Sequence, residues 1–486
     1  MKRARSLSPK SVKDNILAIP SFSDWNLLHN SVLALLPSAP LVRNSLAVVS
    51  EEKLVLKVAA FDLDDTLIMP RSGAVFPRDD PTDWKWLLPT VPRHLRYLHD
   101  AGFMVVILSN QSGIGGKSWN EKKADAIKRK IIGLSKVLEM PLAAFVSTKE
   151  DEWRKPNVGM WKLLQEHSST AVGKDVTLSN ELPGFVFYVG DAAGRKVRTL
   201  AGRKKDFSCS DRKFAFNIEI PFLTPEQLFQ CPITELLDND DKHHHHHRYD
   251  YSKSDVEKIL STRLLTLSAA PCEIDWGGVG PDELKGLASS YDNLTVKRIK
   301  SDGTKDNFEI PTPATFIRDS QEMVIFVGYP GCGKTTFFKR FFEPAGYVHI
   351  NRDTLKTKEK CLLEAEKSWK AGKSVVIDNT NPSHSECMQY ISVVKQHSPN
   401  CSSLPVRIFV FQVSKEMSMH MSNVRARLGI APRISRIAFN VFHSKLESWI
   451  SESVKSMCVE ELLEIPLVAC FDGLPEGIKR EFYLLS

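Results

Sequence analysis

Residues 328–335 constrain the fold of this chain more than any other segment, because they follow the spacing Gly-x-x-x-x-Gly-Lys-Thr. The apolar run Met323–Val327 precedes them, and a helix-compatible segment, residues 336–342, follows. Glycines at this spacing let backbone N–H groups wrap around phosphate groups, and a helix N-terminus favours their negative charge. The sequence therefore predicts a strand, a phosphate-binding loop and a helix, an arrangement typical of parallel strands covered by helices.

This loop and the segments after it supply candidates for phosphoryl transfer from ATP. Lys334 is expected to reach the β- and γ-phosphates and Thr335 to bind Mg²⁺. Asp353 lies 19 residues after Lys334 and is expected to take a proton from an attacking hydroxyl. A helix N-cap is the other interpretation, and the two roles are compatible. Asp378 ends the apolar run 374–377 and is expected to organise Mg²⁺ through water.

Three arginines after a predicted helix form a predicted lid over the transferring phosphoryl group, although arginines are also common on helix surfaces. With them, the residues expected to bind ATP are Gly328, Gly331, Gly333, Lys334, Thr335, Thr336, Asp378, Arg425, Arg427 and Arg433.

A second alternating pattern lies earlier in the chain. The apolar runs 54–63, 103–108 and 185–189 each end in polar residues, and a helical stretch over 120–139 lies between the last two runs. Continuous apolar runs of this length are typical of buried parallel strands. The pattern predicts a second α/β domain whose polar clusters meet at the carboxyl ends of the strands.

The first of these clusters contains Asp62 and Asp64, which point to the same side if the chain stays extended. A carboxylate can attack phosphorus and form an aspartyl-phosphate, and a second acid can protonate the leaving oxygen and then activate water. Two close carboxylates also suit Mg²⁺. Ser109 and Lys155 are placed to hold the phosphate, and Asp191, which follows the third run, to hold the cation.

This order of residues resembles the haloacid dehalogenase phosphatase superfamily. The resemblance implies that Asp62 is the nucleophile and Asp64 the general acid/base, and that Ser109 and Lys155 bind phosphate. The metal ligands predicted for the two sites together are Asp62, Asp64 and Asp191, with Thr335 expected from the glycine-rich loop. Asp65 departs from the Gly that is usual after the second Asp. The second acid of the last motif is not adjacent to Asp191, and Asp206 and Asp211 are both candidates for it.

The two sites together are similar to those of the polynucleotide kinase 3′-phosphatase family. The resemblance is carried by residues 188–195, 205–212, 328–336, 351–354 and 377–382. It implies an α/β fold of two domains, a Rossmann-like phosphatase followed by a phosphate-binding-loop kinase. It also implies Mg²⁺ and ATP as cofactors, removal of 3′-phosphates, and phosphorylation of 5′-hydroxyls at DNA strand breaks. The substrate-binding residues expected on this basis are Arg154, Arg195 and Arg352.

The domain organisation follows from these motifs. At about 150 residues per domain, 486 residues suggest roughly three domains. We predict a basic, largely disordered tail (1–50), the phosphatase (51–235), a His-rich linker (236–253), a connecting segment (254–320) and the kinase (321–486). A tail this short cannot hold the forkhead-associated domain of animal members, so the chain is more similar to the fungal-type form. The five-histidine run 243–247 could bind metal, but a solvated linker is favoured.

Charge and cysteine content set the expected partners and compartment. A net charge of +7 permits a polyanionic partner without requiring one. Basic residues concentrate in two segments. Those at the N-terminus form either a targeting arm or a solvated start of the chain. For those over 195–213, binding of a polyanionic substrate is favoured over a solvated surface. Nine scattered cysteines without Cys-x-x-Cys spacing favour a reducing compartment. We expect a monomer in the nucleus, with a mitochondrial pool left open, and no membrane partner.

Three functions are compared. The main hypothesis is a DNA strand-break enzyme that acts on 3′-phosphate and 5′-hydroxyl ends, with repair-protein partners of unknown identity. An RNA end-healing enzyme is the first alternative, disfavoured because no ligase Lys motif is evident. A catalytically silent end-binding scaffold is the second, and it is disfavoured because Asp62 and Lys334 are both present.

Overall fold

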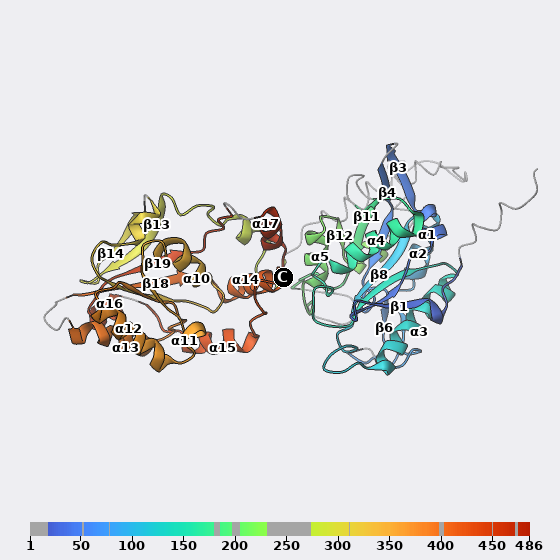
Figure 1. Cartoon of the computed structure of the whole chain (residues 1–486). Helices are drawn as coiled ribbons and strands as arrows, with labels where there is room; N and C mark the ends of the chain where they lie inside the picture. The colour runs from blue at the N-terminus through green and yellow to red at the C-terminus, as the bar shows by residue number, and fades with distance from the viewer. Residues whose placement is uncertain are drawn as a thin grey trace, which may run out of the picture. The chain divides into compact units, whose positions relative to one another are not determined.

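The computed structural model describes residues 18–50, 53–76, 78–178, 185–196, 205–230, 274–310, 312–397, 403–449, 451–471 and 475–486. It divides into two compact units, one of residues 1–277 with Leu485 and one of residues 278–484 with Ser486 (Figure 1). Within the described residues, no helix is both long and apolar enough to span a membrane. The predicted linker 236–253 lies outside the described residues.

The first unit is built on a seven-stranded sheet of order β1-β2-β9-β8-β5-β11-β12. Five of its strands are parallel, and β1 and β2 add an antiparallel hairpin at one edge. The strands are β1 (Trp25–Leu28), β2 (Val32–Leu35), β5 (Val58–Phe61), β8 (Met104–Asn110), β9 (Ala143–Ser147), β11 (Val186–Val189) and β12 (Phe222–Leu223). Smaller strands are β3 (Leu46–Ser50), β4 (Lys53–Leu56) and β10 (Val176–Thr177), which form a three-stranded sheet, and the pair β6 (Ile68–Met69) and β7 (Lys85–Trp86).

Helices cover both faces of this sheet, as the continuous apolar runs require. Along β5, Phe61 packs into one hydrophobic cluster with residues of α2 and α3, while its neighbour Ala60 packs into another with residues of α4 and α5. The helices are α1 (Ala39–Asn44), α2 (Val91–Asp100), α3 (Glu121–Leu138), α4 (Gly159–Val172), α5 (Ser210–Asn217), α6 (Pro225–Phe229) and a short 3-10 turn, η2 (Phe22–Asp24). The predicted helix over 120–139 is confirmed.

The prediction of a disordered tail over residues 1–50 is wrong for its described part, residues 18–50. The run Val32–Leu35 is fully buried as β2 and pairs with both β1 and β9. His29 and Asn30 adopt left-handed backbone conformations and turn the chain between the two strands. Strands of four residues carry too little pattern to be separated from a local helix by sequence alone.

The second unit also has a seven-stranded sheet, of order β14-β13-β19-β18-β15-β17-β16. The strands are β13 (Leu294–Lys300), β14 (Lys305–Ile310), β15 (Met323–Val327), β16 (Val348–Ile350), β17 (Val375–Ile377), β18 (Leu404–Gln412) and β19 (Val459–Pro466). The α-helices are α9 (Pro281–Lys285), α10 (Lys334–Phe337), α11 (Arg352–Leu355), α12 (Lys358–Lys370), α13 (His384–His397), α14 (Lys415–Arg427), α15 (Arg436–Lys445), α16 (Ser451–Met457) and α17 (Glu476–Tyr483). Two further turns are η4 (Pro313–Phe316) and η5 (Phe338–Phe342).

The predicted start of this domain at residue 321 is too late. Strands β13 and β14 lie in the stretch predicted to be a connecting segment, yet β13 pairs antiparallel with β19 and so extends the sheet. Val296 and Ile299 are buried and, being three residues apart, lie on opposite faces of β13, so the strand contributes to the core on both sides of the sheet.

Aromatic packing fixes the helix that follows the glycine-rich loop. Phe337 of α10 contacts the rings of Phe326 on β15 and Phe409 and Phe411 on β18. The loop therefore runs from a buried strand to a helix that is anchored on the same sheet. The strand, loop and helix predicted from residues 323–342 are confirmed.

Candidate active sites

Three carboxylates converge at the carboxyl ends of β5 and β11. Asp62 follows β5 and donates its backbone N–H to the carbonyl of Val189, 2.9 Å away, so the two strand ends stay paired. Asp191 follows β11, and Asp211 lies in the first turn of α5. One oxygen from each of these three carboxylates lies within 4.8 Å of the others. Clustered carboxylate oxygens are the ligands that Mg²⁺ prefers, so this group fits the expected cation.

Lys155 holds two of these carboxylates. Its ammonium donates to Asp62 Oδ1 at 2.7 Å, to Asp211 Oδ1 at 2.8 Å and to the Tyr188 hydroxyl at 2.6 Å. Only 1% of its side chain is exposed, and burial alone would lower its pKa. The two carboxylates outweigh burial and raise the pKa of Lys155, so the lysine stays charged where a phosphate would bind.

Asp211 resolves a choice that the sequence left open. Its second oxygen accepts a hydrogen bond from the Ala192 backbone N–H at 3.0 Å, and its side chain packs against Gly190. Asp206 instead pairs with Arg195, whose guanidinium also pairs with Glu226. The structure thus brings Asp211, and not Asp206, into the carboxylate group. Arg195 lies in these ion pairs, and its predicted contact with substrate stays a prediction.

Asp64 lies beside this group and contacts the second strand end. Its Oδ2 accepts a hydrogen bond from Gln111 Nε2 at 2.6 Å, and the same nitrogen lies 3.2 Å from Ser109 Oγ. Asp65, which stands where Gly was expected, adopts the left-handed conformation that Gly favours, with φ of 54°. The tight turn after Asp64 is therefore kept. The Asp64 carboxylate is not in the three-carboxylate group, so its role as a metal ligand stays a prediction.

Burial raises the pKa values of both catalytic candidates, Asp62 and Asp64. It raises the pKa of Asp62, against the opposing charge of Lys155. It also raises the pKa of Asp64, and the hydrogen bond from Gln111 opposes that rise. A carboxyl group with a raised pKa is suited to carry a proton, which is what a general acid at Asp64 requires. Ionisation of Asp62 depends on Lys155 and on any bound cation.

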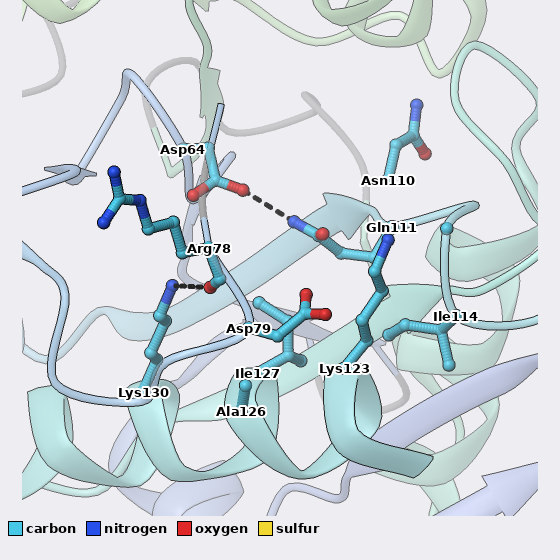
Figure 2. A pocket seen from close by; sticks show the side chains of 11 residues that line it. Asp64, Arg78, Asp79, Asn110, Gln111, Ile114, Lys123, Ala126, Ile127 and Lys130 are labelled. Atoms are coloured by element: carbon cyan, nitrogen blue, oxygen red, sulfur yellow. Dashed lines mark hydrogen bonds between the residues drawn. The ribbon is translucent and has the colours of Figure 1, made fainter. Parts of the chain in front are cut away.

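A cavity opens beside Asp64, as Figure 2 shows. Its volume is about 210 Å³, and Gln111 and helix α3 form part of its wall.

Arg154, predicted to bind substrate, neighbours Lys155 in sequence. One of its buried guanidinium nitrogens has no hydrogen-bond partner in the described part of the chain.

The second site is formed by the glycine-rich loop. Gly331 and Gly333 have φ values of 78° and 99°, which only glycine adopts without strain. The Lys334 ammonium donates to the carbonyls of Gly328 and Tyr329 at 2.9 and 2.7 Å. The ammonium is therefore folded back onto its own loop, and we expect it to exchange these two carbonyls for phosphate oxygens when a phosphate binds.

Asp378 anchors the other side of this site. Its Oδ2 accepts from the Thr335 hydroxyl at 2.6 Å and lies 2.9 Å from His349 Nε2 and 3.2 Å from Asn351 Nδ2. Burial alone would raise the pKa of Asp378, but the hydrogen bonds from His349 and Thr335 outweigh it and lower the pKa. The structure thus joins Thr335 and Asp378, the two predicted Mg²⁺-organising residues, through one short hydrogen bond.

Asp353 and Arg352 lie in α11, directly after β16, and both are exposed. The helix cap is Asn351, whose side chain accepts from the N–H groups of Asp353 and Thr354. The alternative role of Asp353 as the N-cap is therefore wrong. Its carboxylate is left for the proton transfer that the sequence predicts.

The three predicted lid arginines differ in environment. Arg425 and Arg427 lie in the last turn of α14, not after the helix, and Arg433 follows it. Arg427 binds Glu481 and the carbonyl of Leu484, whereas Arg425 and Arg433 are exposed. A side chain placed on Gly331 would meet Ile434 at 3.3 Å, so the segment carrying Arg433 lies against the loop. Contact of these arginines with the phosphoryl group stays a prediction.

Comparison with known proteins now places the chain. A family model described as polynucleotide kinase 3 phosphatase matches residues 57–229, and one described as an AAA domain matches residues 323–448. The bifunctional polynucleotide phosphatase/kinase of Schizosaccharomyces pombe is 31% identical over 396 residues, which span 81% of this chain and 77% of the relative. The chain belongs to the bifunctional polynucleotide phosphatase/kinase family.

Two other relatives fit this placement. A protein of Acanthamoeba polyphaga mimivirus that is named for the same two activities is 31% identical over 404 residues, 80% of each chain. The polynucleotide 3′-phosphatase ZDP of Arabidopsis thaliana is 34% identical over 186 residues, 36% of this chain and 24% of the relative. The first unit is therefore the phosphatase domain and the second the kinase domain, and the predicted fold class is confirmed.

Sequence reasoning missed three residues of these two sites. Tyr188 and Gln111 lie at the ends of β11 and β8 and contact Lys155 and Asp64. His349 lies in β16 and contacts Asp378. Tyr188 and Gln111 lie at or next to the carboxyl ends of predicted parallel strands, which is the signal that could have identified them. The strand that carries His349 was not predicted.

Proposed function

We propose that this enzyme removes 3′-phosphates from DNA strand breaks and phosphorylates their 5′-hydroxyls with ATP. The observation that carries the first activity is the buried Asp62, Lys155 and Asp211 contact at a parallel sheet edge. The second is supported by the glycine-rich loop joined to Asp378 through Thr335. Families of both kinds generally use Mg²⁺, and the kinase family ATP.

In the phosphatase step, Asp62 attacks phosphorus and forms an aspartyl-phosphate as the bond to the strand's O3′ breaks. Asp64 gives its proton to that oxygen. It then takes a proton from the water that hydrolyses the aspartyl-phosphate, and inorganic phosphate leaves. Lys155 and Ser109 neutralise and hold the transferred group. A bound Mg²⁺, held by Asp62, Asp191 and Asp211, would supply further positive charge at the phosphate oxygens.

In the kinase step, Asp353 takes the proton of the attacking 5′-hydroxyl, and the hydroxyl oxygen bonds to the γ-phosphorus of ATP as ADP leaves. Lys334 leaves its two carbonyl partners to bind the phosphates. Arg352, Arg425 and Arg433 are the exposed cations proposed to meet substrate or the phosphoryl group.

The decisive experiment measures both activities in each of two variants, so that the unaffected activity serves as the control for the lost one. Asp62→Asn keeps a hydrogen-bond acceptor for Lys155 but removes the nucleophile, so 3′-phosphatase turnover should vanish while kinase turnover stays. Lys334→Ala should do the reverse. Near-normal phosphatase turnover in Asp62→Asn, or continued 5′-phosphorylation in Lys334→Ala, would contradict the assigned roles.

The nucleic acid is tested separately. Nicked DNA, gapped DNA and RNA ends are offered with ATP and Mg²⁺, and the proposal expects kcat/KM to be highest on DNA. Preference for RNA would instead support the end-healing alternative. We also propose that the protein is nuclear and monomeric. Fluorescence imaging of the tagged protein tests its location, and light scattering tests its oligomeric state.

A further inference from the structure

The cavity beside Asp64 contains cations that the catalytic steps do not use. Three parts of the chain form its wall: the segment after β6, helix α3, and the segment after β8 (Figure 2). The first of these carries Arg78 and Asp79. Helix α3 contributes Lys123 and Lys130 to its wall. With a volume of about 210 Å³, the cavity has room for a group much larger than a single water molecule.

Two of these cations are available for a ligand. Arg78 is exposed and Lys123 half-buried, and no ion pair within 4.0 Å joins either to a carboxylate of the described residues. Two acids are nearby: Asp83, which senses the charge of Arg78, and Asp79, which lines the same cavity.

A Cβ at Gly113 would lie 3.1 Å from Lys123 Nζ, so the ammonium lies against the segment after β8. Gln111, which contacts Asp64, belongs to the same segment and lines the same cavity.

Lys130 has a different task. Its side chain is buried, and its ammonium donates to the backbone carbonyl of Arg78 at 3.2 Å (Figure 2). This bond ties the segment that carries Arg78 to helix α3. The backbone of Arg78 is thereby fixed beside the cavity, and Arg78 and Asp64 line the same space.

The position of the cavity identifies its occupant. Asp64 protonates the leaving O3′, so the deoxyribose that carries this oxygen must lie beside the Asp64 carboxylate, and the cavity is the space found there. A terminal nucleotide of a strand carries a second anion, the phosphodiester on its 5′ side, one sugar away from O3′. Cations in the wall of the same cavity as Asp64 suit that group.

We propose that the cavity binds the 3′-terminal nucleotide of the strand and that Lys123 and Arg78 recognise its 5′-side phosphodiester. The inference rests on the proposed 3′-phosphatase function and names the specificity-determining residues of that site. It explains how the enzyme would favour polynucleotide ends over free nucleoside 3′-phosphates, since only the former carry the second anion.

The test compares two substrates that differ by this phosphodiester: thymidine 3′-monophosphate and the dinucleotide TpTp, which ends in a 3′-phosphate. For the unmodified enzyme, kcat/KM should be about tenfold or more higher for the dinucleotide, as expected for one or two charge-assisted contacts. Lys123→Gln and Arg78→Gln should each reduce this ratio severalfold, through KM of the dinucleotide. Lys122→Gln, an exposed neighbour on the same helix that does not line the cavity, is the matched control and should keep the ratio.

The outcomes separate the two claims. If both variants keep the ratio, or lower kcat/KM for the two substrates equally, the phosphodiester assignment is wrong. Arg78 is exposed, so its substitution tests the idea even if Lys123→Gln unfolds. Turnover of thymidine 3′-monophosphate, which lacks the phosphodiester, reports whether each variant keeps a folded phosphatase domain. If the unmodified enzyme hydrolyses neither substrate nor a longer 3′-phosphorylated strand, the proposed function itself fails.

Discussion

Gly190→Ala should disable the phosphatase although position 190 carries no chemistry. A Cβ at this position would lie 2.5 Å from both Cγ and Oδ2 of Asp211, about 0.9 Å short of the 3.4 Å at which ordinary contact begins. The backbone of Gly190 is not in the left-handed region, so the cost comes from this contact alone. Asp211 has little room to yield, because Lys155, Tyr188 and the Ala192 N–H all bind its carboxylate.

We therefore expect Asp211 to move by about 1 Å relative to Asp62. Displacement of catalytic groups by about 1 Å costs about 100-fold in rate, or about 2.7 kcal/mol in the barrier. The assay is steady-state release of phosphate from a 3′-phosphorylated oligonucleotide over a range of Mg²⁺ concentrations. The Mg²⁺ concentration needed for half-maximal turnover should rise as well, since Asp211 belongs to the carboxylate group that fits the cation.

Gly133→Ala is the matched control in the same domain. Its Cβ would meet Trp84 at 3.7 Å, an ordinary contact, and alanine is favoured over glycine inside helix α3. This variant should keep full phosphatase turnover, and Gly190→Ala should keep kinase turnover. Phosphatase turnover of Gly190→Ala within threefold of the unmodified enzyme would refute the argument that close packing of Asp211 requires glycine.

Three further predictions follow from single contacts. Gln111→Leu removes the hydrogen bond to Asp64, so phosphatase kcat should fall about tenfold with little change in KM; an unchanged kcat would show that Asp64 is positioned by other groups. Asp378→Ala should lower kinase turnover about 100-fold and leave phosphatase turnover intact, measured by ³²P transfer from ATP to a 5′-hydroxyl strand. Arg407→Met leaves the buried Glu322 carboxylate unpaired and should destabilise the kinase domain by about 3–5 kcal/mol, seen as loss of kinase turnover at lower urea; adding Glu322→Gln should recover part of that loss, and no recovery would contradict the ion-pair explanation.

The strands and loops that form the two sites could be predicted from the sequence because they are continuous in it. Residues 323–342 contain a strand, a loop and a helix in one stretch, and β8 and β11 are unbroken apolar runs. Since the carboxyl ends of parallel strands lie at one edge, Asp62 and Asp191 could be placed together without knowing the packing.

What the sequence could not predict depends on contacts between distant segments. Asp211 enters the carboxylate group because the first turn of α5 lies against the segment after β11, where the Ala192 N–H, 19 residues earlier, binds its carboxylate. The sequence offered both Asp206 and Asp211 as candidates and no means of choosing between them. The hairpin β1–β2 and the strands β13 and β14 were missed for the same reason. Each is a short or weakly apolar segment that becomes a strand only by pairing with a sheet formed elsewhere in the chain.

The two sites share one physical solution to the cost of burying carboxylates. An isolated buried carboxylate is unstable as an anion, so each must be given donors before any cation or substrate arrives. Lys155 does this for Asp62 and Asp211, and Thr335, His349 and Asn351 do it for Asp378. Because each set of donors comes from its own domain, removing one set should leave the other activity intact. A bifunctional chain can therefore lose either reaction singly, and the reciprocal variants proposed above depend on that independence.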